Sequence, residues 1–238
     1  MIKNYTVIGI ILARGGSKRI PKKNVKPLAG KSLISYTIDA ARASKYLDRV
    51  MLSTDDTDAM EIAKAAGVEV PFTRPAELAG DTVTDFPVFE HALNWLKEHE
   101  GKVPDIVVQL RPTSPLRTTQ HIDDAVALLA DHPEADSVRT VAEPEQSPYK
   151  MYKIAENGYL EPLLTIEGVP ESFNLPQQKL PKAYKHVGYV DVMWSRTILE
   201  QHKMTGTKIL PLPIEKAKSG INTPDDWDLY EYLINKQQ

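Results

Sequence analysis

The sequence contains no cysteine, and its 238 residues carry a formal net charge of only −3. The absence of cysteine excludes disulfides, thiolate metal sites and a cysteine nucleophile. The near-balance of charge produces no whole-protein field that would favour nucleic acid or an anionic membrane as a partner. No apolar run approaches the roughly 18 residues that span a bilayer, and the amino terminus lacks the layout of a signal peptide. We therefore expect a cytoplasmic protein with no nucleic-acid partner and no membrane partner.

Apolar, strand-like runs alternate with amphipathic, helix-like segments over residues 1–142. The expected strands are 5–12, 49–53, 68–72, 105–110 and 136–141. Strands separated by helical segments of about 10 to 15 residues indicate parallel βαβ units. A further core strand is expected at 186–194, and a helix at 223–237. The pattern predicts an α/β fold with a doubly wound, mostly parallel, Rossmann-like sheet.

Residues 143–185 differ in composition from the rest, being rich in Pro, Glu, Gln and Tyr. They predict an extended arm with a β-hairpin that turns at Asn157-Gly158. The hairpin is too thin to bury its apolar side chains, which are Tyr149, Met151, Tyr152, Ile154 and Leu160. We expect the arm to pack on a second subunit, and the alternative is that it folds back onto its own domain. The core would then comprise residues 1–142 and 186–238.

The loop "LARGGSKRIPKKN", residues 12–24, directly follows the first expected strand. Ligands of open α/β sheets bind beyond the carboxyl ends of the strands. Gly15 and Gly16 permit close backbone approach and a positive φ, while Arg14, Lys18 and Lys23 supply charge that can stabilise a phosphoryl transition state and a departing pyrophosphate. The loop matches neither a Walker A motif nor a dinucleotide-binding fingerprint. Phosphate binding is favoured, and an ordinary charged surface loop is the alternative.

Four motifs occur in order over residues 7–117: "ILARGGSKRIPKKNVKPLAGKSLISYTI", "STDD", "VPFTRPAELAGDT" and "RPTSPLR". Together they resemble the acylneuraminate cytidylyltransferase family, whose members make CMP-activated sialic acids and related nonulosonates. "LPKAY" and "INTPDDW" extend a weaker resemblance toward the carboxyl terminus. The resemblance implies transfer of a cytidylyl group from CTP to the anomeric hydroxyl of an acidic keto-sugar, with release of pyrophosphate and a need for Mg²⁺. It also implies a homodimer in which the arm helps to complete the partner's sugar site.

The same resemblance assigns roles to individual residues. Nucleotide binding is implied for Leu12, Ala13, Arg14, Gly15, Gly16, Ser17, Lys18, Lys23, Asn24, Arg74 and Asp85. Lys23 is our candidate for stabilising charge at the α-phosphate, with Arg14 and Lys18 as the other catalytic cations. Arg74 matches a family arginine near the base, and the alternative for it is a fixed salt bridge.

Several positions depart from the sialic acid enzymes where the sugar would lie. Arg111 replaces a glutamine, Lys185 and Gln177 each replace an arginine, and Asp85 replaces a Ser or Thr. The residues expected to bind the sugar are Arg111, Thr113, Ser114, Gln177 and Lys185. Because an arginine has been moved rather than lost, the departures predict a different acidic sugar.

The family's metal motif, D-I-D-T, reads "GINT" in this chain, with Gly220 and Asn222 in place of carboxylates. Mg²⁺ prefers oxygen ligands, and Asn222 can supply one while the triphosphate supplies others. Asp191 and Asp226 are further candidate ligands, although Asp226 is more simply read as a helix cap. The altered motifs leave two other interpretations open: a nucleotidyltransferase with another base or sugar acceptor, or a nucleotide-binding protein with impaired catalysis.

Overall fold

The computed structural model describes residues 2–215 and 217–236, and the chain divides into two compact units. Unit 1 comprises Met1–Thr140, Gly188–Leu212 and Lys218–Gln238, whereas unit 2 comprises Val141–Val187 and Pro213–Ala217. The sequence analysis placed residues 213–217 with the core, whereas the structure groups them with unit 2. No change in composition along the sequence indicates this.

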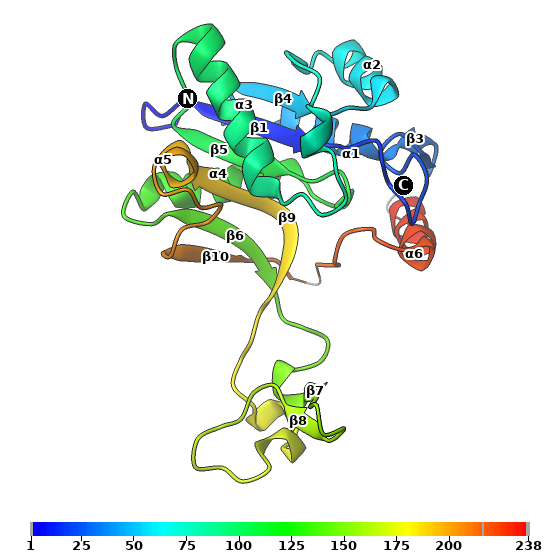
Figure 1. Cartoon of the computed structure of the whole chain (residues 1–238), viewed down its shortest axis with the longest axis vertical. Coiled ribbons are helices and arrows are strands. Elements are labelled where there is room, and N and C mark those ends of the chain that lie inside the picture. Colours follow the sequence, from blue (N-terminus) through cyan, green and yellow to red (C-terminus); the bar gives the residue numbers. More distant parts are fainter. Residues whose placement is uncertain (1, 216, 237–238) are drawn as a thin grey trace. The chain divides into compact units, whose positions relative to one another are not determined.

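A six-stranded sheet forms the centre of the fold, in the order β10-β6-β9-β5-β1-β4 (Figure 1). The strands are β1 (Val7–Leu12), β4 (Arg49–Ser53), β5 (Ile106–Leu110), β6 (Ser137–Ala142), β9 (Lys185–Trp194) and β10 (Ile209–Pro213). β1 pairs in parallel with β4 and β5, while β5 pairs antiparallel with β9. β1 is apolar along its whole length and β5 carries one polar residue, Gln109, because helices cover both faces of the sheet.

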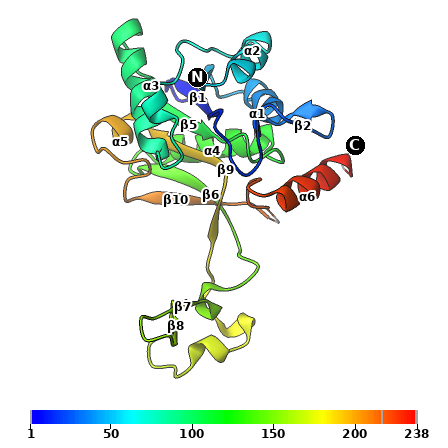
Figure 2. The ribbon, with the colours of Figure 1, turned by 45° about the vertical axis from the view of Figure 1, so that its right-hand side comes forward.

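The helices lie on the two sides of this sheet (Figures 1 and 2). They are α1 (Leu33–Arg42), α2 (Thr57–Ala65), α3 (Asp85–Glu100), α4 (Thr119–Asp131), α5 (Ser195–Leu199) and α6 (Pro224–Asn235). On one face, Phe89 and Leu93 of α3 pack in a fully buried cluster with Ile8 and Ile10 of β1. α1 contacts β1, and α4 contacts β5. This arrangement confirms the predicted α/β fold with a doubly wound, mostly parallel sheet.

One expected strand is absent at the sheet edge. Residues 68–72 form only an isolated bridge, in which Glu69 pairs with Met51. Pro71 has no backbone N–H to donate to a strand ladder, so pairing stops after one residue. The prediction of a strand there was wrong.

The carboxyl-terminal helix α6 packs beside a small hairpin formed by β2 (Pro27–Leu28) and β3 (Lys31–Ser32), as both ribbon views show (Figures 1 and 2). Trp227 and Tyr230 of α6 join Leu28 and Leu33 in a second buried cluster. The cluster also contains Ile221, so the segment that precedes α6 is fastened next to the loop that follows β1.

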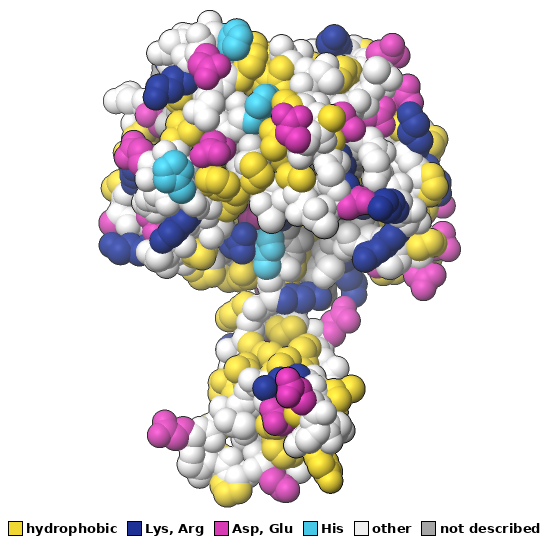
Figure 3. Space-filling view, viewed as in Figure 1, with side chains coloured by type: hydrophobic (Ala, Val, Ile, Leu, Met, Phe, Trp, Pro, Cys, Tyr) yellow, Lys and Arg dark blue, Asp and Glu magenta, His cyan; other side chains and the backbone are white. Residues whose placement is uncertain are grey.

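Unit 2 contains short elements only: η2 (Pro148–Lys150), β7 (Tyr152–Ile154), β8 (Leu160–Pro162), η3 (Ser172–Asn174) and η4 (Gln177–Lys179). β7 and β8 pair antiparallel, and Gly158 adopts a left-handed φ of 83° at the turn between them. The hairpin was therefore predicted correctly, including its turn. Large apolar side chains lie exposed on unit 2, as the yellow atoms in Figure 3 show. They include Tyr152, Ile154 and Leu160, whereas Tyr149 is half-buried.

Candidate functional site

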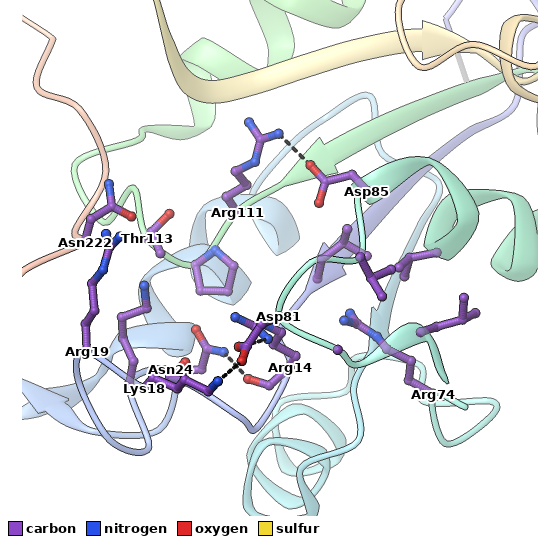
Figure 4. Close-up of a pocket in the computed structure, with 18 of the residues that line it drawn as sticks. Arg14, Lys18, Arg19, Asn24, Arg74, Asp81, Asp85, Arg111, Thr113 and Asn222 are labelled. Carbon is purple, nitrogen blue, oxygen red and sulfur yellow. Dashed lines mark hydrogen bonds and ion pairs between the residues drawn. The ribbon is translucent and has the colours of Figure 1, made fainter. Parts of the chain in front are cut away.

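A cavity of about 640 Å³ opens in unit 1, where β1 and β5 end (Figure 4). Five segments line it: the loop after β1, Arg74 in the loop after α2, the loop before α3, the loop after β5, and Asn222 before α6. Ligands of α/β sheets bind at this edge. The lining contains these residues predicted for the site: Leu12, Arg14, Ser17, Lys18, Lys23, Asn24, Arg74, Asp85, Arg111, Thr113 and Asn222.

The loop after β1 is shaped by hydrogen bonds from the "STDD" segment that follows β4. The Thr54 hydroxyl donates to the Ala13 carbonyl, and the Gly15 amide donates to Asp55 Oδ1 at 2.9 Å. Ala13 is fully buried and has both backbone groups engaged, its N–H with Ser53. Ala13 therefore helps to anchor the loop to the neighbouring strand and is not among the residues that line the cavity.

Neither loop glycine adopts the positive φ that the sequence suggested. A Cβ on Gly15 would lie 3.2 Å from the Asp56 Cβ, a tight contact that favours glycine there. A Cβ on Gly16 would meet no atom within 4 Å. The Gly15 N–H is used by Asp55, and the Ser17 N–H donates to the Gly15 carbonyl at 2.8 Å. Anion binding by this loop must therefore rely on its side chains more than the sequence analysis assumed.

Two of the loop cations share one carboxylate. Asp81, in the loop before α3, accepts from Arg14 Nη1 at 2.7 Å and pairs through its other oxygen with Lys18 (Figure 4). Hydrogen bonds from Lys18 and then Arg14 lower the pKa of Asp81. Asn24 is buried and donates from its side chain to the Arg14 carbonyl at 2.9 Å, which holds the backbone that carries Arg14.

Lys23 lies deeper than the other cations and connects the loop to the end of the chain. Its Nζ donates to the Ile221 carbonyl at 3.1 Å. Burial lowers the pKa of Lys23, and the charges of Arg14 and Arg19 act in the same direction. Arg19 also lines the cavity. Sequence reasoning had singled out three loop cations without it, although its position in the same basic run was a usable signal.

Arg74 is the most deeply buried arginine of the cavity wall, with 5% of its surface exposed. Its guanidinium donates to Ser53, at 3.1 Å to the hydroxyl and 2.6 Å to the carbonyl. Burial lowers its pKa to about 10, so it is charged at neutral pH. Among the described residues no carboxylate forms a salt bridge with Arg74, so that alternative interpretation does not hold. Apolar wall residues accompany it, namely Leu12, Leu78, Val83 and Val88.

Arg111 occupies the carboxyl end of β5, between two carboxylates. Its Nη2 donates to Asp85 Oδ2 at 2.7 Å, and its Nη1 lies 3.3 Å from Asp191 Oδ2. Asp191 is 1% exposed, and the Arg139 Nε lies 3.9 Å from its other oxygen. Gln109 donates to the same Asp85 oxygen at 2.6 Å.

Thr113 and Ser114 follow Arg111 but differ in placement. Thr113 lines the cavity, and its carbonyl accepts the Ile221 N–H at 2.8 Å. Ser114 is buried and donates to the Gly188 carbonyl at 3.2 Å. Ser114 therefore fastens the loop to β9. Gln177 and Lys185 belong to unit 2, where Gln177 lines a separate hollow of about 380 Å³.

The residues present fit a divalent cation poorly unless other ligands arrive with it. No group of three or more His, Asp or Glu side chains suited to a metal is found among the described residues. Asp226 caps α6, accepting the Asn222 and Thr223 N–H groups with one oxygen at 2.8 Å. Burial would raise its pKa, but these hydrogen bonds outweigh that effect and lower it. Asn222 offers a neutral amide oxygen, so most ligands of a bound Mg²⁺ would have to be phosphate oxygens and water.

A basic loop beside a cavity at the carboxyl ends of parallel strands is typical of α/β proteins that bind nucleotides or other phosphates. Residues 8–156 match the cytidylyltransferase family. The chain belongs to that family, as the motifs in its first half indicated.

The relatives include sugar-acid enzymes. Over 240 residues the chain is 30% identical to the N-acylneuraminate cytidylyltransferase of Streptococcus agalactiae serotype III, with 97% of this chain and 55% of that protein covered. It is 30% identical over 237 residues to the CMP-N,N'-diacetyllegionaminic acid synthase of Legionella pneumophila, covering 98% and 97%. Over 107 residues it is 42% identical to the pseudaminic acid cytidylyltransferase of Campylobacter jejuni, covering 45% and 46%. The chain thus spans about half the length of the first of these relatives.

Solved structures share the fold. A CMP:2-keto-3-deoxy-manno-octonic acid synthetase complexed with CTP superposes with a TM-score of 0.71 at 16% identity, covering 98% of this chain and 100% of that one. A 4-diphosphocytidyl-2C-methyl-D-erythritol synthase gives 0.69 at 11% identity, covering 97% and 99%. Within residues 2–215 and 217–236, no helix has the length and apolar character that a membrane crossing requires.

Proposed function

We propose that the chain transfers a cytidylyl group from CTP to an acidic keto-sugar of the nonulosonate class, giving a CMP-sugar and pyrophosphate. The observation that supports this most is the division of one cavity into three different surfaces. The cations of the β1 loop form one, Arg74 with its apolar neighbours forms another, and Arg111 with Asp85 forms the third. These suit a triphosphate, a base and an acidic acceptor, respectively.

In this proposal the loop cations act on the phosphates. Arg14, Lys18 and Arg19 bind the β- and γ-phosphates and stabilise the leaving pyrophosphate. Lys23 lies next to the α-phosphate, where its buried charge counts most because charge accumulates there in the transition state. Its hydrogen bond to the Ile221 carbonyl holds the ammonium in place before CTP arrives.

The base lies against the apolar wall in this proposal. Leu12 and Val88 supply flat contact area, and the buried Arg74 donates hydrogen bonds to base carbonyl oxygens. Because Ser53 accepts from two of the guanidinium nitrogens, the orientation of Arg74 is fixed. A fixed donor discriminates between bases better than a mobile one, since only a base with an acceptor at the matching position pairs with it.

A divalent cation would enter with the triphosphate. Mg²⁺, held by Asn222 and phosphate oxygens, would neutralise phosphate charge and polarise the α-phosphate. The predicted cytoplasmic location stays a prediction.

We further propose a homodimer formed through unit 2. The proposal is supported by the exposure of Ile154 (76%), Tyr159 (73%) and Leu160 (65%) on a two-stranded hairpin. Large apolar side chains on a thin ribbon gain stability by packing against another surface. Gln177 and Lys185 of unit 2 would then contribute to a sugar site shared between subunits.

Pyrophosphate release tests the function directly. The purified protein is incubated with each of the four ribonucleoside triphosphates, Mg²⁺ and a panel of nonulosonic acids, and pyrophosphate and CMP-sugar are measured. We expect release with CTP and at least one acid, and none with CTP alone. Release with another triphosphate would assign a different base. Tight CTP binding without release on any acid would instead favour a nucleotide-binding protein with impaired catalysis.

A further inference from the structure

Asp85, the first residue of α3, has one carboxylate oxygen fixed and the other available. Its Oδ2 accepts from Gln109 Nε2 at 2.6 Å and from Arg111 Nη2 at 2.7 Å. No hydrogen bond or ion pair to its Oδ1 occurs within the part of the chain that the structure describes. The side chain is 40% exposed and lines the cavity. The two donors therefore orient the carboxylate and leave Oδ1 accessible from the cavity.

The only other described carboxylate in the cavity lining is Asp81, and it offers no such oxygen. Asp81 pairs with Arg14 through one oxygen and with Lys18 through the other. Among the described lining residues, Asp85 thus carries the one carboxylate oxygen that remains available to a ligand. A carboxylate next to a triphosphate would be repelled, so its ligand must present a hydrogen-bond donor.

Arg111 places N–H donors directly beside that acceptor. A guanidinium has five N–H donors, and Arg111 directs one toward Asp85 and one toward Asp191. Arg111 pairs with Asp85 and Asp191, and Arg139 lies 3.9 Å from the other oxygen of Asp191, so cationic side chains accompany both carboxylates. The remaining N–H donors of Arg111 favour an anionic group on a ligand that also carries a donor for Asp85.

We infer that Asp85 is a catalytic residue that accepts the proton of the attacking hydroxyl, while Arg111 binds the carboxylate of the same sugar. The closed form of a 2-keto sugar acid carries a carboxylate and the anomeric hydroxyl on one carbon atom. These groups are an acceptor and a donor side by side, complementary to the donor and acceptor of Arg111 and Asp85 (Figure 4). The inference rests on the proposed function. The sequence analysis placed Asp85 both among the nucleotide-binding residues and among the altered positions where the sugar would lie, and the inference assigns it to the acceptor.

The step balances as follows. The anomeric O–H bond breaks and its proton passes to Asp85 Oδ1, while the oxygen forms a bond to the α-phosphorus of CTP. The bond between the α-phosphorus and the bridging oxygen breaks, and its electron pair leaves with pyrophosphate. General base catalysis of this kind contributes a rate factor of about 10² to 10⁴.

Asp85→Asn is the most specific test. The amide oxygen can keep both hydrogen bonds from Gln109 and Arg111, while the amide nitrogen places a donor where Oδ1 was. We expect kcat to fall by about 10²-fold or more, with CTP affinity, measured by calorimetry without acceptor, changed less than twofold. Asp81→Asn is the matched control, since it removes the other lining carboxylate. It should change CTP affinity, which Asp85→Asn should not.

Formate rescue separates chemistry from structure. In Asp85→Ala, added formate should restore part of the lost kcat, whereas a purely structural role would not respond. An Asp85→Asn enzyme with kcat within twofold of the wild type would overturn the inference and leave the proposed function intact. A parallel loss of CTP affinity would overturn it in favour of a nucleotide-binding role. A wild-type protein that releases no pyrophosphate with any acid would refute the proposed function, and the inference with it.

Discussion

Gly220 leaves no room for a side chain, which bears directly on the altered metal motif. A Cβ built on it would lie 2.9 Å from Thr113 Oγ1, 3.0 Å from the Thr113 carbonyl oxygen and 3.2 Å from the Thr113 Cβ. One of these contacts is with backbone, which cannot rotate away. The segment around Gly220 is also fastened, because Ile221 N–H donates to the Thr113 carbonyl and Tyr230 donates to the Ser219 carbonyl at 2.6 Å.

Gly220→Ala should therefore destabilise the protein. Overpacking of this kind costs about 1–3 kcal/mol, and each kcal/mol lowers the Tm of a chain of this size by about 2–4 °C. Thermal unfolding followed by circular dichroism measures the change, with Gly16→Ala as the control because its Cβ would meet nothing within 4 Å. Adding Thr113→Ala removes only the hydroxyl contact, so the double variant should recover part of the loss.

An unchanged Tm for Gly220→Ala would refute this reasoning. The same geometry bears on Gly220→Asp, a substitution that would return a carboxylate to the altered metal motif. The larger side chain must displace Thr113 or the segment that carries Asn222, so Gly220→Asp should weaken the site instead of completing it.

Three further outcomes are expected. Lys23→Ala should lower kcat about 100-fold or more with little change in CTP affinity. Burial, and then the charges of Arg14 and Arg19, lower the pKa of Lys23 in the folded protein, so its charge is lost as pH rises toward 10.5. The kcat/KM for CTP should therefore fall over that pH range in the wild type, and it should fall less in Lys23→Arg. Asn222→Asp should tighten Mg²⁺ binding in the presence of CTP, measured by titration calorimetry, and unchanged affinity would remove Asn222 from the metal site. Tyr152→Asp should yield monomers that bind CTP but turn over poorly; a wild-type protein that sediments as a fully active monomer would contradict the dimer.

The fold was largely predictable because its signals are local. β1 is a continuous apolar run, β5 is apolar except for Gln109, and α3 is followed by Gly101, whose φ of 72° is left-handed. β10 was missed, since its exposed and half-buried residues alternate without an apolar face that the sequence could reveal. The expected strand at 68–72 failed because one proline interrupts it.

The site was less predictable because its contacts join distant segments. The composition of the basic loop was enough to identify it as a candidate phosphate site. Its contacts were not predictable in this way, because Arg14 pairs with Asp81 across 67 residues and Lys23 pairs with Ile221 across 198. Asn24 was predicted to touch phosphate, yet its side chain holds the Arg14 carbonyl. Sequence identifies which residue types gather at the strand ends, whereas the fold decides which of them bind one another.

Under the proposed function, Asp81 would make nucleotide binding an exchange of anions. Arg14 and Lys18 already form ion pairs with Asp81. An incoming triphosphate therefore has to displace the Asp81 carboxylate from these two cations before it can bind them. The two cations are thereby kept close together despite their mutual repulsion, in positions set before CTP arrives. A single phosphate would gain little from displacing Asp81, whereas a triphosphate can offer several oxygens for the one carboxylate it removes. Under the proposed function, the loop before α3 would therefore favour a triphosphate over a CMP-sugar product, which carries a single phosphate.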